Sequence, residues 1–289
     1  MSTVKALINS MRLRTLPLSL AGVVCGGLLA MFFRPDGNTL ELLLVALTAC
    51  SLQILSNLSN EMGDHLSGVD SESREGPNYS MTAGGLTVKQ MWHAINGMVV
   101  VCCVLGLAMV LVSGSPWWVL LLGVAAIWAA THYTLGKKPY GYIGLGDLFV
   151  FVFFGLVSVL GSYFVVAHTI DLKLWLLLPA VGVGLLSVAV LNVNNIRDMQ
   201  SDEGIRRTVP LRIGVRNARI YQTVLVVGGY LLMLVGSGSW WPVATAAIFG
   251  WHLHIVWHRE GRQLDPALPL LVLTTFATSV IYALCRYGL

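Results

Sequence analysis

The sequence predicts an all-α polytopic membrane protein, a bundle of nine transmembrane helices. Composition is the first observation behind this prediction, because 56% of the 289 residues are hydrophobic and only 11% are charged. A soluble globular protein is about 25% charged, and the mean hydropathy of this chain is +0.74. A water-soluble fold would have too little charge to cover this chain, so soluble enzymes, nucleic-acid binders and disordered proteins are excluded.

Nine apolar stretches are the second observation, since a membrane-spanning helix needs about 20 consecutive apolar residues. They cover approximately residues 16–33, 39–59, 90–113, 116–134, 145–167, 172–194, 216–237, 239–257 and 267–286. The pairs Trp117-Trp118 and Trp240-Trp241 lie at the ends of spans, where tryptophan is enriched at the membrane interface. We expect the whole chain, residues 1–289, to form one transmembrane domain.

The distribution of positive charge is the third observation. If the N-terminus is cytoplasmic, 15 of the 18 Lys and Arg residues fall on the cytoplasmic side, and only Arg34, Lys173 and Arg286 fall on the other. Cytoplasmic loops of membrane proteins carry such an excess of Lys and Arg. The pattern favours an odd number of spans, a cytoplasmic N-terminus and a C-terminus on the outside.

Acidic residues gather in two of the predicted cytoplasmic segments. These segments hold 8 of the 14 acids, namely Glu61, Asp64, Asp70, Glu72 and Glu75 in the first and Asp198, Asp202 and Glu203 in the second. If the second helix continues past the membrane, Asn60 and Asp64 share one face, with Asn57 and Glu61 beside them. The ordinary alternative is a solvated loop, but two such clusters in a chain with so few charges favour a functional site.

The second acidic segment has the same spacing of polar residues. Asn194, Asp198 and Asp202 fall at i, i+4 and i+8, which predicts a single helical stripe that begins inside an apolar span. Buried polar groups in a membrane are costly and usually functional. Carboxylate and amide oxygens suit Mg²⁺, which favours a few carboxylates together with phosphate oxygens from a substrate.

These two segments resemble the twin aspartate-rich motifs of the UbiA superfamily of intramembrane aromatic prenyltransferases. The stretch Tyr133-Thr-Leu-Gly-Lys137 is similar to the YxxxK element of that family. Residues 138–147 and 191–198 are similar to the branch that prenylates 1,4-dihydroxy-2-naphthoate in menaquinone synthesis. The chain departs from the family at Glu61, where an aspartate is usual.

The resemblance implies nine helices around a central cavity that opens to the cytoplasm, in the inner membrane of a bacterium. It implies that the two motifs bind Mg²⁺ and an isoprenyl diphosphate. The implied metal ligands are Asn60, Glu61, Asp64, Asn194, Asp198 and Asp202, and the implied catalytic residues are Asp64, Asp198, Asp202 and Lys137. The membrane lipid and the two substrates are the expected partners, and no nucleic acid is expected.

Basic residues in the same segments suit recognition of a diphosphate by Arg forks and a Lys point charge. We expect diphosphate contacts from Tyr133, Lys137, Arg74, Arg197 and Arg207. The alternative is that these positive charges only orient the chain in the membrane. We expect that simpler role for Arg206, Arg212, Arg216 and Arg219, as orientation or lipid-headgroup charges.

Acceptor recognition is predicted from residues close to the YxxxK element. Tyr140 and Tyr142 offer flat aromatic surfaces, and Asp147 opens the fifth span at membrane depth, where an acid is usually functional unless it caps the helix. We expect Asp147, Tyr140, Tyr142 and Asn57 to contact the acceptor.

The expected reaction moves a long isoprenyl chain from polyprenyl diphosphate to 1,4-dihydroxy-2-naphthoate, with loss of CO₂ and diphosphate, giving demethylmenaquinone. One alternative is another aromatic acceptor, such as 4-hydroxybenzoate. A second alternative, from a different class, is a secondary transporter. Transporter sites lie near the bilayer midplane, whereas these acids lie at predicted helix ends beside Arg and Lys, which favours the enzyme.

Other candidate motifs are weaker. All five cysteines lie in apolar stretches, so we expect small buried side chains and no disulfide framework. His252, His254 and His258 do not share one helical face, and we expect them at the membrane interface rather than around a metal. The glycines between Gly141 and Gly146 are expected to form a tight turn, because no strand precedes them.

Overall fold

The structure, a computed structural model, describes residues 2–33, 38–68, 80–81, 83–170 and 172–287. Arg74, a predicted diphosphate contact, lies outside these residues. Every regular element in the described part is helical. The first half holds α1 (Thr3–Ser10), η1 (Leu13–Thr15), α2 (Leu16–Phe33), α3 (Thr39–Ser67), α4 (Val88–Ser113), α5 (Val119–His132) and η2 (Tyr140–Ile143). The second half holds α6 (Gly146–Val150), the π-helix η3 (Phe151–Gly161), α7 (Ser162–Ala167), α8 (Leu174–Arg197), α9 (Met199–Asp202), α10 (Val209–Ser237), η4 (Trp241–Thr245), α11 (Ala246–His258), η5 (Gly261–Leu264) and α12 (Ala267–Tyr287).

The helices confirm the all-α membrane fold, but not the count of nine spans. Within the described residues, 7 helical segments are long and apolar enough to cross a membrane. The other two predicted positions hold α5, with 14 residues, and α11, with 13. At about 1.5 Å per residue, these two helices are only about 20 Å long, shorter than the roughly 30 Å hydrocarbon core. They are short because Pro116 to Trp118 precede α5 and the 3₁₀ turn η4 precedes α11.

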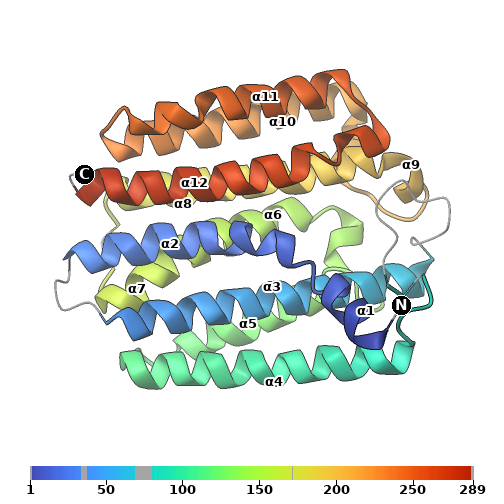
Figure 1. The fold of residues 1–289 in the computed structure, drawn as a ribbon, viewed down its shortest axis with the longest axis horizontal. Helices are drawn as coiled ribbons and strands as arrows, with labels where there is room; N and C mark the ends of the chain where they lie inside the picture. Colours follow the sequence, from blue (N-terminus) through green and yellow to red (C-terminus); the bar gives the residue numbers. More distant parts are fainter. Residues whose placement is uncertain (1, 34–37, 69–79, 82, 171, 288–289) are drawn as a thin grey trace.

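The long helices lie side by side and run back and forth along one direction (Figure 1). The carboxyl ends of α3 and α8 lie at the same end of the bundle as α1 and α9, whereas α12 ends at the opposite end. Both acidic segments are therefore placed at one end of the molecule.

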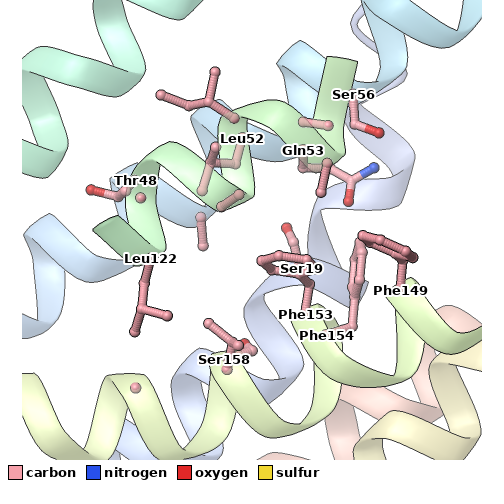
Figure 2. Close-up of a pocket in the computed structure, with 18 of the residues that line it drawn as sticks. Ser19, Thr48, Leu52, Gln53, Ser56, Leu122, Phe149, Phe153, Phe154 and Ser158 are labelled. Atoms are coloured by element: carbon pink, nitrogen blue, oxygen red, sulfur yellow. The ribbon is translucent and has the colours of Figure 1, made fainter. Parts of the chain in front are cut away.

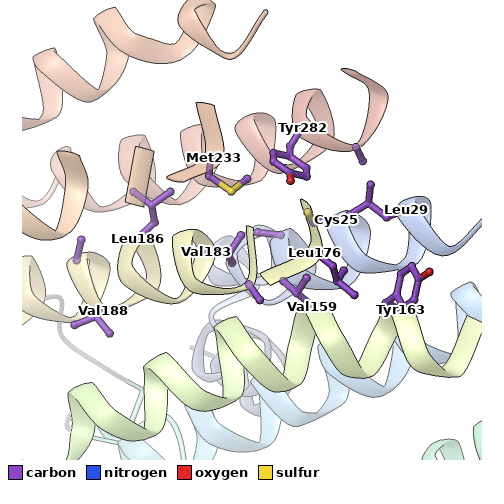
Figure 3. Close-up of a cluster of buried hydrophobic side chains, with 14 of the residues drawn as sticks. Cys25, Leu29, Val159, Tyr163, Leu176, Val183, Leu186, Val188, Met233 and Tyr282 are labelled. Carbon is purple, nitrogen blue, oxygen red and sulfur yellow. The ribbon is translucent and has the colours of Figure 1, made fainter. Parts of the chain in front are cut away.

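Close helix crossings form the core around α2, η3, α8, α10 and α12 (Figure 3). A Cβ added at Gly26 of α2 would lie 2.0 Å from the Val159 carbonyl oxygen, and one added at Gly155 would lie 2.6 Å from Gly184 Cα. Small residues let membrane helices approach in this way. All five cysteines, each in the described part, are free; Cys25 and Cys102 are buried as expected, but Cys103 is exposed, so that part of the expectation is wrong.

The carboxyl ends of α3 and α8 differ in shape, and this difference positions the site. α3 continues for 29 residues through Asn60 and Asp64 until Gly68, at φ 74°, ends it, so the predicted extension of this helix is confirmed. α8 ends at Arg197, and Asp198, with φ −93° and ψ 9°, separates it from α9. The prediction of one continuous stripe through Asp198 is therefore wrong, because the chain leaves helical geometry at that residue.

Candidate active site

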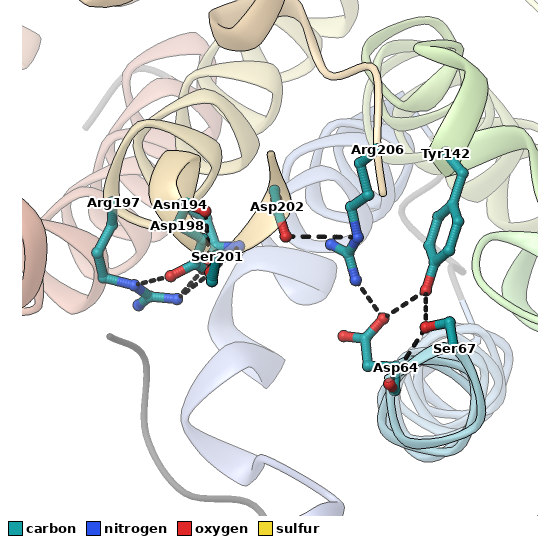
Figure 4. A network of polar contacts seen from close by, with 9 residues as sticks. All are labelled: Asp64, Ser67, Tyr142, Asn194, Arg197, Asp198, Ser201, Asp202 and Arg206. Atoms are coloured by element: carbon teal, nitrogen blue, oxygen red, sulfur yellow. Dashed lines mark hydrogen bonds and ion pairs between the residues drawn. The ribbon is translucent and has the colours of Figure 1, made fainter. Parts of the chain in front are cut away.

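A buried arginine joins the two acidic segments (Figure 4). The Arg206 guanidinium donates to Asp64 Oδ1 of α3, and its Nε lies 3.5 Å from Asp202 Oδ1 of α9. Burial alone would lower the pKa of Arg206, but Asp64 and Asp202 outweigh burial and hold that pKa above its usual value. The expectation that Arg206 is a surface charge is wrong. Its spacing of i, i+4 from Asp202 is the signal in the sequence that indicates the pairing.

Tyr142 of η2 completes this group. Its hydroxyl donates to Asp64 Oδ1 at 3.1 Å and lies 2.8 Å from Ser67 Oγ, while the Arg206 guanidinium lies 4.8 Å from the ring centroid. Burial, and then the nearby Asp64, raise the pKa of the Tyr142 hydroxyl. The tyrosine therefore stays a hydrogen-bond donor that fixes the Asp64 carboxylate.

A second arginine holds the middle of the second acidic segment. Arg197 Nε and one terminal nitrogen donate to the two oxygens of Asp198 at 2.7 and 2.8 Å, and both residues are buried. Arg197 also donates to Asn194 Oδ1 at 2.8 Å and to Asp265 Oδ1 at 3.0 Å. Arg197, predicted to contact diphosphate, is thus bound to its own motif. Asp265 is a partner that the sequence pattern did not indicate.

A cavity of about 660 Å³ extends from this polar group into the bundle. Asn60, Asp64, Asn194 and Arg206 line its polar end, and aromatic and aliphatic side chains line most of its length, with Phe149, Phe153 and Phe154 on one wall (Figure 2). Among the described residues that line it, Arg12, Asp64 and Arg206 are the charged ones. One continuous space thus has an ionic end and an apolar interior.

The cavity wall also carries an amide whose orientation is fixed. Asn57 uses both hydrogens of its side-chain amide, donating to the Met11 carbonyl at 2.9 Å and to Thr15 Oγ1 at 3.0 Å. Asn57 Oδ1 must then accept from Gln53 Nε2 at 3.1 Å. Gln53 Oε1 is left buried, without a hydrogen-bond partner. A buried carbonyl of this kind costs about 1–3 kcal/mol, which a ligand hydroxyl would recover.

Asn57 is a predicted acceptor contact, whereas Gln53, a residue of the cavity wall, was not predicted as a site residue. Asn57 does not line the cavity and instead ties α3 to the segment before α2. A glutamine inside the predicted span 39–59 is the signal that was available, because polar side chains at membrane depth are usually functional.

Several other predicted site residues do not meet the carboxylates. Lys137 and Arg207 are exposed and do not line the cavity. Glu61 is fully buried, and its Oε1 accepts the Met81 backbone N–H at 3.0 Å.

Asp147 accepts the Tyr221 hydroxyl at 3.0 Å, away from the cavity wall. These residues stay predictions that the geometry does not bring together.

Two predicted tyrosines do line the cavity. Tyr133 follows α5, and Tyr140 donates its hydroxyl to the Ala129 carbonyl at 2.8 Å. The Tyr140 ring stacks on Phe149 with centroids 4.0 Å apart. Both tyrosines therefore supply aromatic surface beside the ionic end.

The donor set suits Mg²⁺ carried by a diphosphate. Asp64 and Asp202 face each other across Arg206, and the amides of Asn60 and Asn194 lie on the adjoining wall. The described residues contain no group of three or more His, Cys, Asp or Glu that could hold a metal alone. Mg²⁺ commonly uses one or two carboxylates and takes its other ligands from water and substrate phosphates, so the residues present fit it.

The histidine group is not a metal site in the described structure. His252 is 1% exposed, and it contacts Gln222 Nε2 at 2.9 Å and the Ala267 carbonyl at 3.1 Å. Its expected interface position is therefore wrong, because this polar network buries it between helices. The rings of His254 and His258 lie 4.2 Å apart between centroids and are tilted by 31°.

Fold and site together define a multi-pass helical membrane protein with a cavity that carries a carboxylate and an arginine at its polar end. The chain belongs to the UbiA prenyltransferase family, whose model matches residues 19–269. It is 43% identical over 277 residues to a 1,4-dihydroxy-2-naphthoate octaprenyltransferase of Escherichia coli (strain K12), covering 94% of this chain and 84% of that protein. A Haemophilus influenzae protein of the same name is 35% identical and covers 94% of this chain and 92% of its own length.

Solved structures show the same fold. The apo structure of a UbiA homolog from Aeropyrum pernix K1 matches with a TM-score of 0.69 at 14% identity, over 92% of this chain and 96% of that one. A UbiA homolog from Archaeoglobus fulgidus bound to GPP and Mg²⁺ matches with a TM-score of 0.67 at 14% identity, over 100% of each chain.

Proposed function

We propose that the protein transfers a long isoprenyl chain from polyprenyl diphosphate to 1,4-dihydroxy-2-naphthoate, with loss of CO₂ and diphosphate, giving demethylmenaquinone in its reduced form. The observation that carries the proposal is the continuous cavity, whose ionic end and apolar interior fit a charged headgroup on a long apolar chain. The names of relatives that align with most of the chain support the choice of acceptor.

The ionic end would hold the diphosphate. Asp64 and Asp202, supported by the Asn60 and Asn194 amides, would bind Mg²⁺, which when bound neutralises charge on the leaving diphosphate. Arg206 lies between the two carboxylates and would donate to phosphate oxygens. Further proposed contacts from the sequence analysis are Glu61, Asp198, Tyr133, Lys137, Arg197, Arg207 and Arg74.

The aromatic wall would protect the allylic cation formed when the C–O bond breaks. Tyr140, Phe149 and Phe153 line the cavity near the ionic end, and aromatic rings attract cations. The apolar surroundings exclude water, so a ring carbon of the acceptor captures the cation.

The acceptor would lie between the aromatic wall and α3. Gln53 Oε1, which has no hydrogen-bond partner while Gln53 Nε2 donates to Asn57, would accept a hydrogen bond from a ring hydroxyl. Arg12 on the same cavity would offer positive charge to the carboxylate. Tyr140 would supply flat surface, and Asp147 and Tyr142 remain proposed contacts from the sequence.

Transfer by purified protein in nanodiscs tests the proposal. Mg²⁺ and a radiolabelled polyprenyl diphosphate are combined with either 1,4-dihydroxy-2-naphthoate or 4-hydroxybenzoate. We expect a labelled prenylated naphthoquinol product, abolition by EDTA and recovery with added Mg²⁺. Faster transfer to hydroxybenzoate would overturn the acceptor, and full turnover after chelation would overturn the metal.

We also propose that the protein works as a single domain, residues 1–289, in a bacterial inner membrane with the ionic end cytoplasmic. The asymmetry of Lys and Arg supports this orientation. On a background without the native cysteines, an impermeant thiol reagent added to intact cells should label Ser239→Cys and not Glu203→Cys. The reverse labelling pattern would overturn the orientation.

A further inference from the structure

Two glycines face the long apolar part of the cavity, Gly106 of α4 and Gly123 of α5. Both line the cavity, and a Cβ added at either one meets no atom within 4 Å. The glycines in the core behave differently, since a Cβ at Gly22 would lie 2.4 Å from Ser158 Oγ. Close helix packing therefore accounts for Gly22, but it does not account for Gly106 or Gly123.

Positions along the helices place both glycines far from the ionic end. Tyr133 lines the ionic end of the cavity, and Gly123 precedes it by ten residues, which is about 15 Å along a helix. Cys102 of α4 donates to Ser51 of α3 at 3.3 Å. Ser51 precedes Asp64 by about 20 Å along α3. Gly106 lies one helical turn beyond Cys102 on α4.

We propose that Gly106 and Gly123 keep open the passage for the distal isoprene units, and so set the longest chain that the cavity accepts. This inference rests on the proposed prenyl transfer. With an advance of about 1.3 Å per C–C bond, an extended geranyl chain spans about 9 Å and ends before Gly123. An octaprenyl chain spans about 40 Å on the same basis and must pass both glycines.

A side chain at either glycine therefore distinguishes short from long substrates. Leucine at Gly123 or Gly106 would project into the cavity and block the path of the distal units, whereas the diphosphate and the allylic cation are bound nearer the ionic end. The matched control is Gly97→Leu, because Gly97 lies on α4 with open space around its Cβ position but does not line the cavity.

The experiment compares geranyl and octaprenyl diphosphate in nanodiscs with 1,4-dihydroxy-2-naphthoate and Mg²⁺. We expect Gly123→Leu and Gly106→Leu to keep geranyl transfer within about twofold and to lose octaprenyl transfer by at least about tenfold, a change of about 1.4 kcal/mol. Gly97→Leu should leave both rates unchanged. Alanine variants at the same positions, which add one methyl group, should give a smaller loss for the long chain only.

If the ratio of octaprenyl to geranyl transfer rates in the folded variants equals that of the parent, whether both rates fall or neither does, the inference is overturned. Folding is checked by gel filtration and thermal unfolding, and the alanine variants give the ratio if a leucine variant does not fold. Failure of the proposed function has a different signature, because the parent protein would then transfer neither chain to the naphthoate.

Discussion

The first and second acidic segments have the same spacing in the sequence but different roles in the structure. In the first, the continuous helix α3 carries Asn60 and Asp64 onto the cavity wall. In the second, the helix ends before Asp198, and of Asn194, Asp198 and Asp202 only Asn194 lines the cavity. Arg197 binds Asp198, and Arg206 lies beside Asp202. An i, i+4 pattern therefore predicts a shared face only as far as the helix itself continues.

The carboxylates of the two segments fall into two groups, those beside the cavity and one that is bound within the protein. Asp64 and Asp202 share one arginine beside the cavity, and Asp198 is bound at both oxygens by a buried arginine. Substitutions at Asp64 or Asp202 should therefore reduce activity, whereas substitution of Arg197, the partner of Asp198, should reduce stability.

The largest expected effect is on stability. Arg197→Met removes the buried arginine that binds both oxygens of the Asp198 carboxylate, which costs about 3–5 kcal/mol and should lower the midpoint of thermal unfolding in detergent. Adding Asp198→Asn should recover part of the loss, because the unpaired charge is removed. Arg216→Met, at an exposed arginine, is the control and should change little. Equal midpoints for Arg197→Met and Arg216→Met would contradict the scaffold role.

The next effect is on turnover. Asp64→Asn and Asp202→Asn should each reduce kcat by about 10²–10³-fold, the scale for losing one preorganised electrostatic group. Glu203→Gln, an exposed acid in the same loop, should keep parental activity. If Asp64→Asn turns over normally with full Mg²⁺ dependence, the ionic end described here is not the diphosphate site.

A smaller effect is expected at Gln53. Gln53→Leu removes the unpaired side-chain carbonyl of this cavity-lining residue, and losing a hydrogen bond of about 0.5–1.5 kcal/mol should raise KM for the naphthoate several-fold. KM for the prenyl diphosphate should stay unchanged. Gln90→Leu, at a capping glutamine on the exposed start of α4, controls for general destabilisation. A rise confined to the diphosphate KM would place Gln53 in the headgroup site instead.

The smallest effect is expected at Tyr142. Tyr142→Phe removes one donor to Asp64 and should cost about 0.5–1.5 kcal/mol. Because the pKa of Tyr142 is raised in the folded protein, the folded state keeps its proton where the unfolded chain releases it. The stabilisation from this residue is therefore constant below the usual tyrosine pKa of about 10 and declines above it. The midpoint of thermal unfolding, measured against pH for the parent and for Tyr142→Phe, checks this. A difference between the two midpoints that changes between pH 6 and 9 would contradict it.

The sequence predicted the features that depend on local pattern. The apolar stretches predicted the helices, and Asp64 was placed correctly on an extension of α3, which continues through Gly63 to Ser67. Arg206 and Arg207 show the limit. They are neighbours in a loop, and the chain path between α9 and α10 decides which of them is buried. The pairs Asp147–Tyr221 and Arg197–Asp265 join residues 74 and 68 positions apart, so periodicity carries no information about them.

The bond from Arg206 to Asp64 spans 142 residues of sequence, and it fastens the carboxyl end of α3 to the segment that leads into α10. Arg206 is therefore an internal counter-ion of Asp64 in the first acidic segment. Mg²⁺ that binds Asp64 would exchange one cation for another, so its affinity would report the difference between two sets of contacts rather than the strength of either. The same exchange would release Asp64 from Arg206, and would so link loading of the cavity to the contact between α3 and the α9–α10 segment.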